Sequence, residues 1–131
     1  MSFVKNIKAK YLFHKGISAA KSGNLRLAVS LLQKSSYLLL EMIHDGDKQY
    51  ESHYARTEMN LGVLYNKAGE IDESLHSFLL AIRTLMVLVR KGRIDLLEDL
   101  SKAQSVFNTL YPGATIDLER GIITGVYNPA P

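Results

Sequence analysis

The feature that most constrains the fold is a pair of segments with the same order of large and small residues. The better copy runs from Met59 to Ala81 and turns at Gly69, and a weaker copy turns at Gly23. Gly16 and Gly62 each precede their turn glycine by seven residues. A repeated helix–turn–helix unit cannot bury its apolar face alone, so it predicts stacked helical hairpins. Downstream of the turns the paired positions keep their size class: Ala28 with Ser74, Leu32 with Phe78, and Ser35 with Ala81.

Glycine, proline and small polar residues divide the chain into five stretches with the apolar period of a helix. The connections between them are short, and short connections make consecutive helices pack antiparallel as neighbours. The sequence therefore predicts an all-α fold of antiparallel hairpins. The expected helices cover residues 2–21, 25–44, 48–68, 71–91 and 94–110.

The better copy resembles the tetratricopeptide (TPR) repeat, whose signature is W-x2-L-G-x2-Y followed by A-x3-F. The resemblance covers roughly residues 9–110 and implies a right-handed solenoid that binds other proteins. Gly16 and Gly62 lie 46 residues apart, whereas the usual TPR period is 34. The extra residues add about three helical turns to a unit, so we expect a divergent TPR-like fold with extended repeats. The matching residues in the better copy are Leu61, Gly62, Tyr65, Gly69, Ser74, Phe78 and Ala81.

At 131 residues, the chain is long enough for one domain with its own core. We expect a helical domain over residues 1–111 and an apolar C-terminal tail over residues 112–131. There is no cysteine, so disulfides and thiol chemistry are excluded, and no apolar run is long enough to span a membrane. We expect a cytoplasmic protein with no membrane partner. The net charge of +3 allows an acidic partner without demanding nucleic acid.

In TPR-like stacks the first helix of each hairpin lines the concave groove. The resemblance therefore implies a peptide-binding groove on the first, third and fifth helices, with apolar residues at its centre and basic residues at its ends. The alternative is that the apolar members belong to the core and the lysines are a solvated rim. The candidate partner-binding residues are Lys10, Phe13, His14, Ile17, Lys21, Arg56, Met59, Asn60, Val63, Asn66 and Lys67.

The tail after Pro112 and Gly113 carries too many apolar residues to stay in water. Three destinations are open: a cap over the last helix, the chain's own groove, or another subunit. Terminal units of a stack must cover their apolar face, which favours the cap. The glycines and β-branched residues of the tail also suit an extended docking peptide. The candidate docking residues are Ile122, Ile123, Val126 and Tyr127.

The sequence contains no nucleotide-binding loop, nucleophile elbow or histidine pair at metal-ligand spacing. We therefore expect no enzyme activity, no cofactor and no metal. The main hypothesis is a protein-interaction module, such as an adaptor, assembly chaperone or regulator, that holds a peptide segment of a partner. One alternative is a structural subunit of a homo-oligomer or larger assembly joined through the tail. Another is a nucleic-acid accessory protein that uses the basic first helix, although aromatics spaced for base stacking are lacking.

Overall fold

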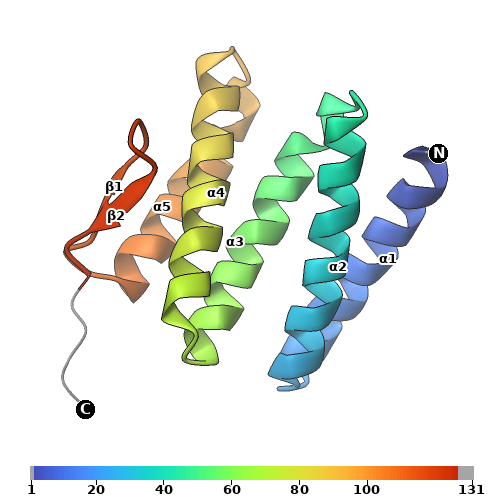
Figure 1. Ribbon diagram of the computed structural model, residues 1–131, viewed down its shortest axis with the longest axis horizontal. Helices are drawn as coiled ribbons and strands as arrows, with labels where there is room; N and C mark the ends of the chain where they lie inside the picture. The colour runs from blue at the N-terminus through green and yellow to red at the C-terminus, as the bar shows by residue number, and fades with distance from the viewer. Residues whose placement is uncertain (1, 127–131) are drawn as a thin grey trace.

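The computed structural model describes residues 2–126 and is all-α, apart from one short β-hairpin near the C-terminus (Figure 1). The expected helices are all present, and the third and fifth each begin with a short 3₁₀ turn. In chain order the elements are α1 (Ser2–Lys21), α2 (Leu25–His44), η1 (Lys48–Tyr50), α3 (Glu51–Lys67), α4 (Ile71–Arg90), η2 (Ile94–Leu96), α5 (Leu97–Leu110), β1 (Thr115–Asp117) and β2 (Ile122–Thr124).

The 46-residue spacing found between two glycines recurs in the helix boundaries of the structure. Helix α4 begins and ends 46 residues after α2, and η2 lies 46 residues after η1. The hydrogen bonds of the two tight turns repeat at the same interval: Gly23 N donates to Ala20 O, and Gly69 N donates to Asn66 O. The chain therefore consists of two complete helical hairpins and the first helix of a third.

Glycine closes the two tight turns because each turn requires a left-handed backbone. Gly23 and Gly69 have φ angles of 81° and 78°, a region that other L-residues rarely adopt. The next helix is then started by Asn24, whose side chain accepts a hydrogen bond of 3.2 Å from Leu27 N. This N-cap satisfies one of the free N–H groups of α2.

Within each hairpin the two helices approach most closely at the paired glycines. A Cβ atom at Gly62 would lie 2.8 Å from the Phe78 ring, and one at Gly16 would lie 2.9 Å from the Leu32 side chain. Both partners are fully buried. Only glycine leaves room for the facing side chain at this distance. Leu32 and Phe78, which were aligned by size alone, therefore make equivalent contacts in the two hairpins.

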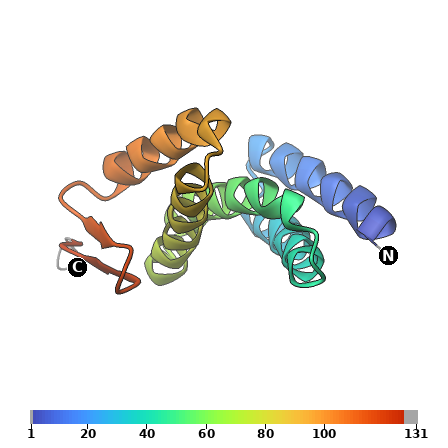
Figure 2. The ribbon, with the colours of Figure 1, turned by 90° about the horizontal axis from the view of Figure 1, so that it is seen from above.

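The helices lie in two rows. Figure 2 shows α1, α3 and α5 along one side, with α2, α4 and the β-hairpin along the other. Contacts follow chain order, from α1 with α2 through α2 with α3 to α4 with α5. The hairpin therefore occupies the place that a second helix of the third unit would take. A right-handed TPR-like superhelix stays a prediction.

The tail folds back on its own chain. Strands β1 and β2 pair antiparallel, with Ile116 opposite Ile123. Ile116, Leu118, Ile123 and Val126 pack against the core cluster of α4 and α5. Of the three destinations considered for the tail, the structure shows the cap over the last helices. Tyr127, named as a docking residue, lies outside the described residues.

Candidate functional site

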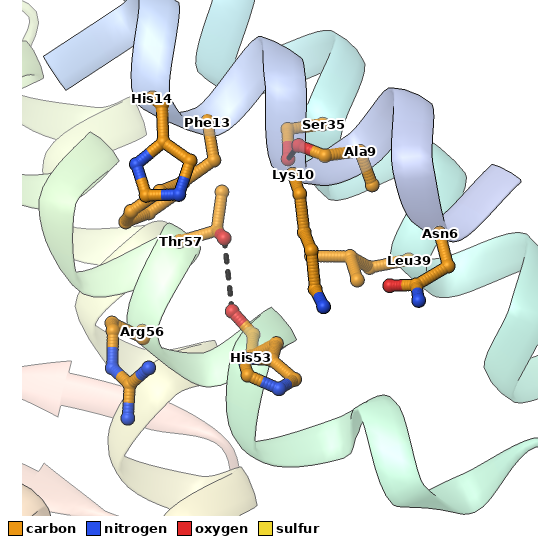
Figure 3. Close-up of a pocket in the computed structure, with 10 residues that line it drawn as sticks. All are labelled: Asn6, Ala9, Lys10, Phe13, His14, Ser35, Leu39, His53, Arg56 and Thr57. Atoms are coloured by element: carbon orange, nitrogen blue, oxygen red, sulfur yellow. Dashed lines mark hydrogen bonds between the residues drawn. The ribbon is translucent and has the colours of Figure 1, made fainter. Parts of the chain in front are cut away.

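The side formed by the odd-numbered helices has a pocket of about 150 Å³ between α1 and α3 (Figure 3). Its floor is Ser35 and Leu39 of α2. Figure 3 shows Lys10 extending from α1 toward His53 of α3, with Arg56 further along α3. Lys10 and Arg56 are positively charged, two further lining residues are histidines, and none is acidic. The lining residues are Asn6, Ala9, Lys10, Phe13, His14, Ser35, Leu39, His53, Arg56 and Thr57.

A second, smaller pocket of about 110 Å³ lies on the other side of α3, between α3 and α5. Arg56 lines both pockets. The hollowed surface of this side therefore continues across α3, from α1 to α5. The residues that line the second pocket are Ser52, Ala55, Arg56, Met59, Asn60, Leu85, Asp99 and Lys102.

Basic residues recur along this surface with the period of the fold. Lys10, Arg56 and Lys102 are separated by 46 residues each, so they take equivalent positions on α1, α3 and α5. All three are exposed. Equivalent positions on successive helices form a row, and we call Lys10, Arg56 and Lys102 the basic row. A row of cations spaced by one repeat can contact successive acidic groups of one extended ligand.

One carboxylate partly neutralises the basic row. Arg56 Nη2 lies 3.5 Å from Asp99 Oδ2, and the two side chains are 45% and 41% exposed. An exposed pair of this kind is worth at most about 1 kcal/mol, so it does not hold Arg56 away from a ligand. Within residues 2–126, no acidic side chain lies at ion-pair distance from Lys10 or Lys102.

His53 is the titratable group most affected by this environment. Burial lowers its pKa below the ordinary value, and the charges of Arg56 and Lys10 lower it further. The imidazole is therefore neutral near pH 7. An anion bound beside these groups would oppose the last two effects and raise the pKa of His53. Acidic conditions would then add a positive charge to the pocket.

The structure gathers only part of the predicted groove into these pockets. Lys10, Phe13, His14 and Arg56 line the first pocket. Met59 and Asn60 line the second, together with Arg56. The apolar members are also partly buried in the core, as the alternative interpretation expected: Phe13 and Ile17 pack against Leu32 and its neighbours, whereas Met59 and Val63 pack against the cluster around Phe78.

The remaining predicted residues lie beyond the pockets, near the helix ends. Lys21 and Lys67 are exposed in the last turns of α1 and α3. Asn66 has a structural contact: its amide donates a hydrogen bond of 3.1 Å to the Tyr111 hydroxyl. The Tyr111 hydroxyl donates in turn to Ser74 Oγ at 2.7 Å, and Ser74 Oγ donates to Gly62 O at 2.6 Å. This polar chain ties α3, α4 and the end of α5 together.

The opposite side of the molecule differs in charge. A shallow groove between α2 and α4 contains Glu58 and Glu73 beside Tyr54 and Tyr65. Glu58 is buried and accepts a hydrogen bond of 2.7 Å from Ser36 Oγ. Burial, with the charge of Glu58 as a second cause, raises the pKa of Tyr54 to about 12. This groove therefore suits an acidic ligand less well than the pockets between α1, α3 and α5.

Among the pocket residues that sequence reasoning missed, three carry an ionisable side chain: His53, Asp99 and Lys102. Lys102 had a detectable signal, because it lies one further period of 46 residues after Arg56. His53 and Asp99 had none, since both occupy the position equivalent to Ile7 and the repeat does not preserve the residue type.

The fold and site define a class: an all-α protein of stacked hairpins with a basic, hollowed side. No family model, curated protein or solved structure matches this chain. In the described part of the chain, no group of three histidine or acidic side chains could hold a metal ion. None of the helices described is both long and apolar enough to cross a membrane.

Proposed function

We propose that the protein is a cytoplasmic, non-enzymatic interaction module that binds an acidic peptide segment of a partner protein along α1, α3 and α5. The observation that carries the proposal is the basic row, Lys10, Arg56 and Lys102, placed beside two pockets. Phe13 lines the first pocket and Met59 the second, and both offer apolar contact between the charges. Such a surface suits an adaptor, an assembly chaperone or a regulator.

The TPR-like assignment is part of the same proposal. It is supported by the repeated contacts of Gly16 with Leu32 and of Gly62 with Phe78, and by the two rows of helices (Figure 2). In a TPR-like stack the odd-numbered helices line the ligand groove, which is the side that carries the basic row. The absence of an acidic lining residue in the first pocket favours an acidic ligand over a basic one.

The test uses a defined probe: a fluorescein-labelled peptide of about twelve residues in which glutamate and leucine alternate. A second peptide with lysine in place of glutamate controls for charge. We expect the acidic peptide to bind, by fluorescence anisotropy, and the basic peptide not to bind. The double variant Lys10→Glu/Arg56→Glu is expected to weaken binding of the acidic peptide by about tenfold or more, since it removes two exposed charge contacts worth up to about 1 kcal/mol each and replaces them with repulsion.

A matched control comes from the chain itself. Lys21→Glu/Lys67→Glu changes the net charge by the same amount at equivalent, exposed positions outside the pockets, and we expect about a twofold effect or less. Equal losses in the two double variants would show general electrostatic attraction rather than a site. Failure of the acidic peptide to bind the unaltered protein would reject the proposed function.

A further inference from the structure

The outer face of α1 exposes an unusual amount of apolar surface for the end of a stack. Phe3, Val4, Ile7 and Tyr11 are 71%, 62%, 54% and 59% exposed. Their spacing places them along one face of the helix. Helix α1 is the terminal helix of its row, with no element beyond it (Figure 1). The face therefore has no covering element among the described residues.

The internal repeat shows what covers the equivalent positions elsewhere. In α3 and α5 the positions equivalent to Val4 and Tyr11 face the preceding hairpin, and three of these four side chains are buried there. The positions equivalent to Phe3 and Ile7 hold polar residues that are not buried: Gln49, His53, Asp95 and Asp99. Helix α2 packs on α3, and α4 packs on α5. The outer face of α1 is thus the helix-docking face of the repeat, without its helix. The equivalent sets are Val4, Lys8, Tyr11 and Lys15; Tyr50, Tyr54, Thr57 and Leu61; and Leu96, Leu100, Ala103 and Phe107.

The chemistry of α1 departs from the other two helices at two of these positions. Lys8 replaces Tyr54 and Leu100, and Lys15 replaces Leu61 and Phe107. Val4 and Tyr11 stay apolar, and Lys15 Nζ lies 5.7 Å from the centre of the Tyr11 ring. A helix that covered this face would bury the apolar stripe of α1. It would also contact Lys8 and Lys15, which lie beside the stripe about two helical turns apart. Such lysines are stabilised only if the covering helix supplies carboxylates.

The charge around the face is of one sign. None of the first 40 residues is Asp or Glu, so α1 provides no acidic side chain for Lys8 or Lys15. Lys5 already has partners, because its Nζ lies 3.3 Å from Glu41 Oε2 and 3.5 Å from Asp45 Oδ2. A second copy is a poor partner. Two α1 helices packed face to face would set lysines against lysines, and the other end of the stack is closed by the β-hairpin.

We propose that the outer face of α1 docks an amphipathic helix of a partner protein whose apolar stripe is flanked by acidic residues. That helix takes the place on α1 that α2 takes on α3. The proposal goes beyond the proposed function, because it uses the edge of the stack and not the basic row. It defines a second interface, which allows the protein to hold two acidic segments on different surfaces.

The test uses a labelled helical peptide of about twenty residues with leucine at the a and d heptad positions and glutamate at e and g. A second peptide with lysine at e and g is its control. Fluorescence anisotropy is expected to show binding of the glutamate helix that weakens with salt, and binding of the lysine helix at least about tenfold weaker. Ile7→Glu/Tyr11→Glu, at two exposed sites, is expected to abolish binding while circular dichroism shows unchanged helicity.

Two further variants make the result specific. Lys8→Glu/Lys15→Glu should reverse the preference, so that the lysine helix binds better than the glutamate helix. Arg56→Glu/Lys102→Glu, which changes the basic row on α3 and α5 and leaves α1 unaltered, should leave binding of the glutamate helix within about twofold of its original value, and this separates the outer face from the groove. A loss caused by the groove variant and not by Ile7→Glu/Tyr11→Glu would overturn the proposal.

Other occupants of the face give other results. Flotation with phosphatidylserine vesicles that is abolished by Ile7→Glu/Tyr11→Glu, without binding of the glutamate helix, would overturn the proposal in favour of a membrane surface. A dimer seen by light scattering and removed by the same variant would overturn it in favour of self-association.

Discussion

The two ends of the stack use the same repeat positions in opposite ways. At the C-terminal end, Leu100 and Phe107 of α5 are buried beneath α4. At the N-terminal end, the equivalent residues are Lys8 and Lys15, and both are exposed on α1. The backbone is α-helical at these positions in both places. A repeat position therefore does not determine burial by itself. Whether another element covers the helix at that position decides whether an apolar or a charged residue is stable there.

The covered end is also the better packed. The Phe78 and Phe107 rings meet edge to face with centroids 5.6 Å apart, and Tyr111 lies 5.6 Å from Phe107 and 6.3 Å from Phe78. Edge-to-face aromatic pairs add to the stabilisation that comes from burial alone. The β-hairpin completes this cluster. The first unit has Leu32 where the second has Phe78, and its outer helix lacks a cap. We expect stability to be concentrated in the C-terminal half.

The largest expected difference lies between Phe107→Ala and Lys15→Ala. Phe107 is 2% exposed, so its truncation should lower the free energy of unfolding by about 3–5 kcal/mol. The equivalent change at Lys15 should cost less than about 0.5 kcal/mol. Urea denaturation followed by circular dichroism measures both. Similar costs at the two sites would show that the outer face of α1 is covered in solution.

Tyr54 is the equivalent of Lys8 in the second unit. Its raised pKa predicts that the protein loses stability at alkaline pH. Its pKa is about 12 in the folded protein, against about 10 when unfolded. Below about pH 9 the phenol is protonated in both states and its contribution is intact. As the pH rises toward 12, the unfolded state ionises first, and about 1–2 kcal/mol is lost.

Tyr54→Phe removes this phenol and leaves that of Tyr65. The difference in unfolding free energy between the original protein and the variant should therefore change between about pH 9 and about pH 11.5, in favour of the variant. A constant difference over this range would mean that the Tyr54 hydroxyl reaches water in the folded state.

Ser74→Ala introduces the residue that the first unit has at Ala28. The change removes the acceptor of the Tyr111 hydroxyl and the donor to Gly62 O, so we expect a loss of about 1–2 kcal/mol. In a double-mutant cycle, Ser74→Ala and Tyr111→Phe should be less costly together than the sum of the two single changes, because they act on the same hydrogen bond. Strict additivity would contradict the polar chain.

The smallest expected effect is at Asp99, whose equivalent in α1 is Ile7 on the outer face. Asp99→Asn removes the carboxylate 3.5 Å from Arg56. The acidic peptide should then bind about two- to threefold tighter, with less than about 0.5 kcal/mol change in stability. Anisotropy titration checks the first expectation and urea denaturation the second. Weaker binding after this change would mean that Asp99 orients Arg56 for its ligand.

The helices could be predicted from the sequence because their boundaries have local causes. Gly23 and Gly69 end their helices through a left-handed backbone, and Pro112 stops the helical pattern of α5. The β-hairpin was not predicted as such. Its residues suit a strand, but pairing of Ile116 with Ile123 depends on the apolar surface of α4 and α5, which is formed only after the chain folds.

The candidate site was predicted only in part, and the reason is the rotation of each helix. Lys10 and Arg56 were found because the resemblance aligned the two units. Asn66 was assigned to the groove, but it lies nearly two helical turns beyond the pockets, where it donates a hydrogen bond to Tyr111 from a distant part of the chain. The same alignment would have identified Lys102 if the 46-residue period had been continued into the third unit.

The constant spacing of the structural boundaries makes the chain extensible in principle. A copy of residues 47–92 inserted after Gly92 would begin and end at equivalent turns, so neither the exposed first helix nor the closing β-hairpin would need to change. Each duplication would add one hairpin and one more cation to the basic row. Growth by whole units would thus lengthen the surface proposed to bind an acidic segment, while both ends of the stack stay as they are.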